Sequence, residues 1–240
     1  MNYKFDLFKN NYLMLYKKYV SPVIVDVFDI AMAYKRNLND DFKQDLSDIS
    51  DTLILLEKAM AKEDLLCLNA ALSRICVFSN GVSNSLRAIS DDIDTLFDKS
   101  TQKINKLNLE EEQQYQKEEM YQKTSFEHLK EMFVEIINNY SKGFVVTENL
   151  KMNYEINWDD RLNKLLSDFN QEVIFLDSME NGELTSNYVE CLQRIQHIAS
   201  ESSDFFEFIW DDSVYLLNIP TWPEFPEDYR IPECYHYPHL

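Results

Sequence analysis

Glycine is scarce in this sequence, and proline is almost absent from all but the C-terminal end. The 240 residues include three glycines and six prolines, and five of these prolines lie between Pro220 and Pro238. Because glycine and proline are the residues that most often interrupt helices, this distribution predicts long helices with short connections. The sequence also contains no glycine-rich phosphate-binding loop and no nucleophile-elbow motif.

Features of secreted, disulfide-bonded and membrane proteins are missing as well. The four cysteines show no Cys-x-x-Cys spacing, and Cys67 and Cys76 would lie on opposite sides of one predicted helix, so we expect reduced thiols. No early segment resembles a signal peptide, and no window approaches about 18 uninterrupted apolar residues. We therefore expect a cytoplasmic protein that does not enter a membrane.

Basic residues are few, above all in the second half of the chain. The formal net charge is −19, and from Leu165 onward there are 15 acidic residues and only two basic ones, Arg194 and Arg230. The sequence contains no basic patch that could neutralise phosphates, so direct binding to nucleic acid is disfavoured.

An internal similarity is the strongest positive signal. The segment Leu-Ser-Arg-Ile at residues 72–75 recurs as Leu-Gln-Arg-Ile at residues 192–195, which is 120 positions later. The ungapped comparison at this offset gives 19 identities in the 73 positions from 21 to 93, against about one in sixteen expected by chance. This similarity predicts an internal duplication.

Apolar residues recur every three or four positions, as on the buried face of a helix, most clearly over 42–60 and 162–179. We predict an all-α fold with two tandem helical-bundle repeats, residues 1–93 and 123–212. Pro22 suits the first turn of a further helix in the first repeat. Residues 94–122 are predicted to form a charged linker helix, and residues 213–240, rich in proline and aromatic residues, an extended arm. We expect the arm to pack on the second repeat, and a partner or a second copy of the chain is the alternative.

The two repeated arginines, Arg74 and Arg194, lie at the flank of their predicted apolar stripes. We predict that each has a structural role and pairs with an acid of the same copy, for which Asp48 and Asp168 are the best candidates.

Catalytic and metal sites find little support in the sequence. The Asp-Asp pairs lack the further carboxylate spacing of a magnesium site, and Cys234, His236 and His239 lack a fourth ligand for zinc. We therefore predict no metal, no cofactor and no enzymatic activity. An enzyme with an unrecognised carboxylate site remains an alternative.

The loss of basic residues in only one of two similar copies favours a recognition surface for a basic protein. The predicted function is a non-enzymatic acidic binding protein, such as an immunity protein or antitoxin against a cationic toxin. The alternatives are a phage-type inhibitor that mimics the charge of nucleic acid, and a duplicated scaffold, adaptor or homodimer. The predicted partner-binding residues are Glu172, Glu180, Glu183, Glu190, Glu201, Asp204, Glu207, Asp211, Asp212, Tyr188, Trp210 and Trp222.

Overall fold

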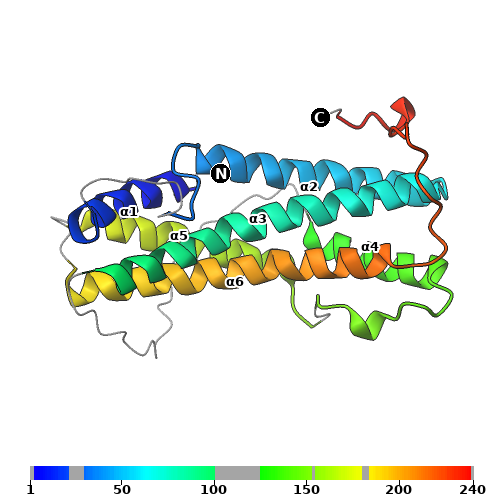
Figure 1. Ribbon diagram of the computed structural model, residues 1–240. Coiled ribbons are helices and arrows are strands. Elements are labelled where there is room, and N and C mark those ends of the chain that lie inside the picture. The colour runs from blue at the N-terminus through cyan, green and yellow to red at the C-terminus, as the bar shows by residue number, and fades with distance from the viewer. Residues whose placement is uncertain (1–2, 22–29, 101–124, 153–154, 180–183, 239–240) are drawn as a thin grey trace. The chain divides into compact units, whose positions relative to one another are not determined.

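The protein is all-helical wherever its structure is described. The computed structural model describes residues 3–21, 30–100, 125–152, 155–179 and 184–238, which form six α-helices and no β-strand (Figure 1). The helices are α1 (Phe5–Tyr19), α2 (Leu38–Ala61), α3 (Leu65–Lys99), α4 (Phe126–Tyr140), α5 (Trp158–Ser178) and α6 (Ser186–Leu217). Two short 3₁₀ helices, Thr147–Asn149 and Glu233–Tyr235, complete the described elements.

The predicted apolar stripes are confirmed as the buried faces of α2 and α5. Phe42, Leu46, Ile49, Leu53 and Leu56 of α2 are buried. The corresponding stripe of α5 is buried as well and consists of Leu162, Leu166, Phe169, Val173 and Leu176. These side chains recur at the spacing that places them on one side of an α-helix, where their burial stabilises the fold through the hydrophobic effect.

Several predicted segment limits differ from the structure. The helix α3 continues to Lys99 and α6 to Leu217, so helix extends past residues 93 and 212, where the repeats were predicted to end. The further helix suggested by Pro22 does not include residues 30–37, which form turns and bends; residues 22–29 lie outside the described part. Residues 101–124, most of the predicted linker helix, also lie outside it.

The chain divides into two compact units, and each draws on both halves of the sequence. Unit 1 comprises Met1–Phe42, Ser83–Tyr121 and Leu162–Asp204, and unit 2 comprises Lys43–Val82, Gln122–Arg161 and Phe205–Leu240. Shifting the limits of unit 2 by 120 positions, with the halves exchanged, gives 2–41, 85–120 and 163–202, within two residues of the limits of unit 1. The compact units therefore differ from the predicted repeats. The limits of the repeats rest on sequence similarity alone and stay a prediction.

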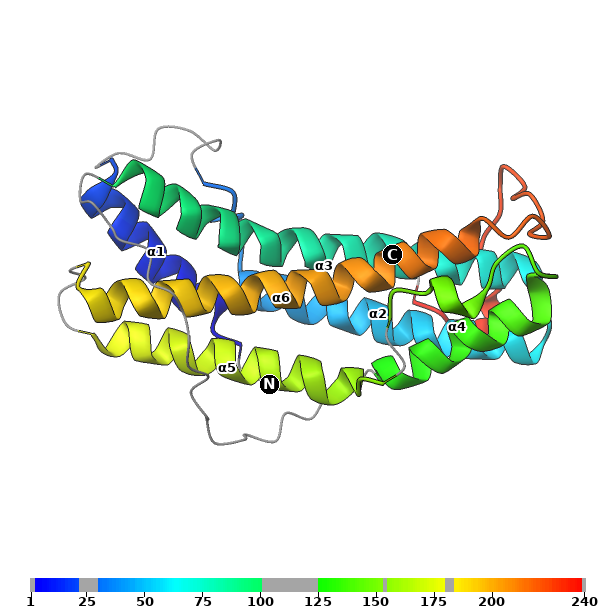
Figure 2. The same ribbon diagram turned by 90° about the horizontal axis from the view of Figure 1, so that it is seen from below.

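Unit 1 is built from α1, the end of α3, most of α5 and the start of α6. The ring of Phe5 lies 4.8 Å from that of Phe42 and 4.8 Å from that of Phe169. The helices α5 and α6 lie side by side (Figures 1 and 2). Ser83 of α3 and Ser203 of α6 meet with their Oγ atoms 2.9 Å apart, and these two residues are separated by 120 positions. Small side chains at this contact allow the two helices to approach closely.

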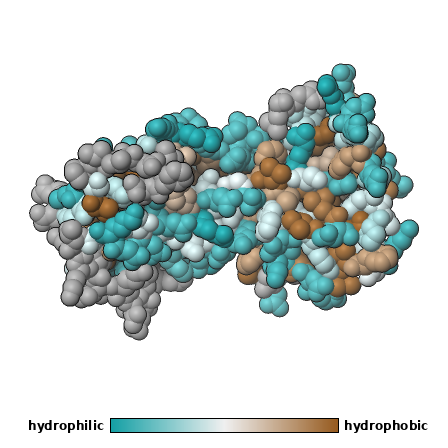
Figure 3. All heavy atoms as spheres, viewed as in Figure 1, coloured by the Kyte–Doolittle hydropathy of each residue, from teal (hydrophilic) through white to brown (hydrophobic). Residues whose placement is uncertain are grey.

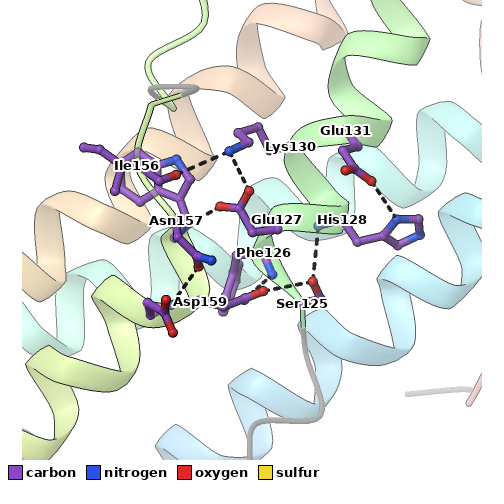
Figure 4. A network of polar contacts seen from close by, with 11 residues as sticks. Ser125, Phe126, Glu127, His128, Lys130, Glu131, Ile156, Asn157 and Asp159 are labelled. Atoms are coloured by element: carbon purple, nitrogen blue, oxygen red, sulfur yellow. Dashed lines mark hydrogen bonds and ion pairs between the residues drawn. The ribbon is translucent and has the colours of Figure 1, made fainter.

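Unit 2 is built from α4, most of α2, the start of α3 and the end of α6. Its core includes the rings of Phe126 and Phe205, which are 4.9 Å apart, and Trp158, whose ring lies 5.2 Å from that of Phe205. Asp159 accepts hydrogen bonds from the Ser125 hydroxyl at 2.9 Å and from the Phe126 N–H at 2.7 Å (Figure 4). These contacts fix the start of α4 against the start of α5.

In each unit, a buried lysine holds one helix, α1 in unit 1 and α4 in unit 2, to the chain that leads into the next helix. In unit 2, Lys130 Nζ is 2.7 Å from a Glu127 carboxylate oxygen and donates to the Ile156 carbonyl, while Glu127 accepts from the Trp158 N–H (Figure 4). In unit 1, Lys9 pairs with Asp6 and donates to the Arg36 carbonyl, and Asp6 accepts from the N–H groups of residues 38 and 39.

A buried aspartate holds a loop in each unit. Asp92 accepts from the N–H groups of Ala31 at 2.6 Å and Met32 at 2.9 Å. Asp212 accepts from those of Lys151 at 2.6 Å and Met152 at 3.0 Å. Burial raises the pKa of each carboxyl group to about 6, although the backbone hydrogen bonds act to lower it. Each of Ala31, Met32 and Asp92 lies 120 positions before its counterpart in the second cluster, which consists of Lys151, Met152 and Asp212.

Residues 219–238 contain no α-helix and pack within unit 2. The Trp222 ring lies 5.9 Å from that of Tyr140, so part of this segment contacts the second half of the chain as expected. The Tyr235 hydroxyl, however, donates to Asp64 at 2.8 Å, and the Tyr237 hydroxyl lies 2.9 Å from Thr52 Oγ1. The end of the segment thus packs on α2 and α3 of the first half rather than on the second repeat.

Candidate functional site

The loop 141–152 in unit 2 exposes two apolar side chains. Phe144 is 68% exposed and Val146 is 41% exposed. The Asp212 carboxylate holds the end of the loop, and the Tyr215 hydroxyl accepts from the Val146 N–H at 3.1 Å. The loop is therefore fixed to the last turns of α6 while two apolar side chains face solvent.

Acidic side chains lie in a row along this part of α6. Glu207, Asp211 and Tyr215 follow at intervals of four, so they share one side of the helix. Glu207 and Asp211 are half-buried, as is the neighbouring Trp210. We name the group Phe144, Val146, Glu207, Trp210 and Asp211 the acidic-apolar surface. Exposed apolar side chains and acidic side chains in one unit are suited to contact a protein surface that carries basic residues.

Five of the predicted partner-binding residues are not available on a described surface. Glu172, Asp212 and Tyr188 are buried, with exposed fractions of 0%, 1% and 2%, so their assignment to a binding surface is corrected. Burial of Glu172 follows from its position on the inner side of α5, where it pairs with an arginine. Glu180 and Glu183 lie outside the described residues.

The other predicted residues are accessible to different degrees. Glu190 and Glu201 are partly exposed and pair within the helix, with Arg194 and His197 respectively. Asp204 is exposed in unit 1. Trp222 is half-buried, because its indole N–H donates to the Leu216 carbonyl at 2.8 Å and its ring contacts Tyr140. Glu207, Trp210 and Asp211 therefore lie half-buried on one stretch of α6 in unit 2.

The structural role predicted for the repeated arginines takes different forms in the two copies. Arg194 Nε donates to Glu172 at 2.7 Å and its Nη1 to Glu190 at 2.7 Å. The Arg74 guanidinium lies over the Tyr237 ring, 4.9 Å from its centre. The two predicted acidic partners have other contacts: Asp48 accepts from Gln44, and Asp168 lies 3.8 Å from Lys164.

Sequence reasoning missed Phe144 and Val146. Their signal was the run of three apolar residues after Lys142 and Gly143, where helical spacing is lost. Lys142 and Gly143 both have positive φ angles, of 49° and 84°, so the chain leaves α4 in a turn that glycine adopts readily.

Comparisons with known proteins found no match. No protein-family model matches the chain, and no curated protein and no solved structure matches it. Function must therefore be inferred from the structure itself.

In the described ranges, no group of three or more His, Cys, Asp or Glu side chains could hold a metal ion; His239 of the tail lies outside these ranges. By length and composition one described helix, α3, qualifies as a membrane span. This is weak evidence for a span, because the core helix of a soluble protein has the same properties.

Proposed function

We propose that this chain is a non-enzymatic acidic binding protein that neutralises a basic protein partner, in the manner of an immunity protein or antitoxin. The observation that carries the proposal is the acidic-apolar surface of unit 2. Phe144 and Val146 supply apolar area that a partner can cover, while Glu207 and Asp211 supply charge that attracts it. The large negative net charge adds long-range attraction of a cationic partner.

The first 120 residues offer an internal control for this surface. The positions equivalent to Glu207 and Asp211 are Arg87 and Asp91, so the first copy carries a base where the second carries an acid. A charge needed only for solubility has no reason to reverse at one of two equivalent positions. This difference favours recognition over solubility.

We expect neutralisation of Asp211 and Glu207 to slow partner association. A partner would first be isolated from the native host by copurification and identified by mass spectrometry. For wild type, the association rate constant should fall about tenfold or more between 50 and 500 mM salt, because steering between charges is screened. The double variant Glu207→Gln/Asp211→Asn should associate several times more slowly at low salt, and Phe144→Ser should dissociate about tenfold faster.

Asp91→Asn is the matched control, since Asp91 is the exposed counterpart of Asp211. It should leave both rate constants within about twofold of wild type. Equal binding at low and high salt, or a loss caused by Asp91→Asn as large as that caused by the double variant, would contradict the proposed surface.

We also propose that the chain arose by internal duplication of a unit that formed an intertwined homodimer. One support is that the limits of one compact unit match those of the other when they are shifted by 120 positions and the two halves of the chain are exchanged. The other is that Asp92 and Asp212, and likewise Lys9 and Lys130, make equivalent contacts in the two copies. In a two-fold symmetric dimer each contact occurs twice with the partners exchanged. A scaffold or adaptor descended from such a dimer is the second candidate function.

Separate halves of the chain test this arrangement. We expect fragments 1–112 and 113–240 to copurify as a 1:1 complex when coexpressed, because each compact unit needs helices from both. Alone, each half should be unfolded or form a homodimer, as sizing by light scattering would measure. Two halves that each fold as stable monomers would contradict the arrangement and would instead favour independent repeats at 1–93 and 123–212.

A further inference from the structure

Arg74 and Arg194 occupy equivalent positions in the two copies, but only Arg194 has carboxylate partners. Arg194 is held by two acids, the buried Glu172 and the partly exposed Glu190, each at 2.7 Å. The positions equivalent to these acids, 120 residues earlier, are Thr52 and Ala70. Both acids are therefore missing around Arg74.

The surroundings of Arg74 do not replace these acids. Its guanidinium lies over the Tyr237 ring, and the Tyr237 hydroxyl contacts Thr52 Oγ1 at 2.9 Å. Within the described part of the chain, Arg74 forms no ion pair. An arginine without an acidic partner is unexpected in a chain with 42 acidic and 23 basic residues. Half-burial of Arg74 also limits its hydration, which favours binding of an anion.

Two pockets lie beside Ala70, the position equivalent to Glu190. Ala70, Arg74 and Tyr229 line two adjoining pockets of unit 2, with volumes of about 450 and 810 Å³. The larger pocket is also lined by Arg230, which forms no ion pair with any described residue. Glu233 lines it too and is not paired with either arginine. Alanine at this position, where the second copy has a glutamate, thus leaves space next to two guanidinium groups without ion pairs among the described residues.

The smaller pocket supplies an apolar wall beside these charges. It is lined by Val77, Phe78, Phe225 and Pro226, and Val77 and Phe225 are 66% and 43% exposed. In Figure 3, hydrophobic residues gather on one face of unit 2. A ligand that fits both pockets has an apolar body and an anionic group.

We propose that this cavity binds an organic carboxylate with an apolar body. Its carboxylate takes the place at Arg74 that Glu190 takes at Arg194, and Arg230 contributes a second positive charge. The apolar body lies against Val77, Phe78 and Phe225. This site shares no residue with the acidic-apolar surface and does not depend on the proposed partner.

The test is direct titration of the full chain with 4-phenylbutyrate, followed by calorimetry and by NMR shifts of labelled side-chain methyl groups. We expect saturable binding that shifts the Val77 and Ala70 methyl signals, and binding at least tenfold weaker for the uncharged amide of the same acid. Arg74→Gln should weaken binding about tenfold, because it removes charge-assisted hydrogen bonds. Arg161→Gln, which changes an exposed arginine elsewhere in unit 2, should leave the affinity unchanged.

Ala70→Glu is the decisive variant. It restores the glutamate four residues before the arginine, as in the Glu190 and Arg194 pair, so it should abolish binding while the circular dichroism and thermal midpoint show a folded protein. Equal affinity for the acid and its amide, or full affinity in Ala70→Glu or Arg74→Gln, would overturn the proposal.

The same carboxylate chemistry is offered by a free organic acid and by the C-terminus of a polypeptide. Acetyl-Ala-Ala-Phe with a free carboxylate represents the second source, and its C-terminal amide is the control. Tighter binding of the peptide acid than of 4-phenylbutyrate supports a chain terminus as the ligand, and the reverse order supports a small acid. Absence of saturable binding by both acids contradicts the site.

Discussion

Lys130→Met should lower the free energy of unfolding by about 3 kcal/mol, as measured by urea denaturation. The Lys130 side chain is 7% exposed and pairs with Glu127, whose side chain is 30% exposed. Breaking a buried ion pair by removal of one partner costs about 3 to 5 kcal/mol, because the other charge stays behind without compensation. Because Glu127 is partly exposed, water stabilises its charge in the variant, so the expected loss of unfolding free energy lies at the lower end of this range.

The variant also removes a donor from the Ile156 carbonyl, whereas methionine retains most of the apolar volume. Lys9→Met, at the equivalent position of unit 1, should have a similar effect. The control is Lys164→Met, which removes an ion pair with Asp168 whose lysine is 53% exposed. That change should cost less than about 1 kcal/mol. Equal losses of unfolding free energy in Lys130→Met and Lys164→Met would show that the buried ion pair contributes no more stability than the exposed one.

The free energy of unfolding should rise as the pH falls from 7 to 5. The pKa of Asp92 and of Asp212 is raised by burial to about 6, from an ordinary value of 3.8. Between these values the native state binds more protons than the unfolded state, so the stability lost to the buried charge is recovered as the pH falls through about 6. Each group contributes up to about 3 kcal/mol, at 1.36 kcal/mol per pKa unit.

At lower pH the trend should reverse. Burial acts to raise the pKa of Asp6 and Glu127, but hydrogen bonds from Lys9, Lys130 and backbone N–H groups outweigh it and lower both values. Their stabilisation is present above the ordinary pKa and is lost as the pH falls through the lowered pKa. Maximal stability is therefore expected near pH 4 to 5.

Asp92→Asn/Asp212→Asn should flatten the dependence between pH 7 and pH 5, as measured by denaturation at a series of pH values. Protonation of surface acids also reduces self-repulsion in a chain of net charge −19. The neighbouring pair Asp91→Asn/Asp211→Asn controls for that contribution, since Asp91 is exposed and Asp211 half-buried. A slope reduced equally in both double variants would show that the buried loop clamps do not determine it.

Helix positions and buried faces could be predicted from the sequence because helical periodicity reports which side of a helix leaves water. Periodicity does not report which helix covers that side. The stripe of α1 gave no sign that Phe5 meets Phe169 of the other half, and tandem repeats were the simplest reading of the similarity. Residues 101–124, on which the linker prediction rests, lie outside the described part of the chain.

Single polar residues were harder to place than apolar stripes. Asp92 and Asp212 look like helix-end or solvent-exposed charges in the sequence, yet both are buried loop clamps. Glu172 resembles a surface acid until its arginine partner is located. In each case the partner is a backbone N–H group or a side chain distant in sequence, and no local pattern encodes it. The Arg74 cavity was not predicted for the same reason, because Ala70 and Tyr229, which both line it, are far apart in the sequence.

The composition of the two units has a consequence for synthesis on the ribosome. The first helix, α1, is completed at Tyr19, but its aromatic side chains pack on α5, which begins at Trp158. At roughly 5 to 20 residues per second, about seven to thirty seconds separate the synthesis of Tyr19 from that of Trp158. The apolar faces of α1 and α2 therefore leave the ribosome before the helices that cover them have been made. The nascent chain is thus a candidate for chaperone binding, and it folds chiefly after its second half has been synthesised.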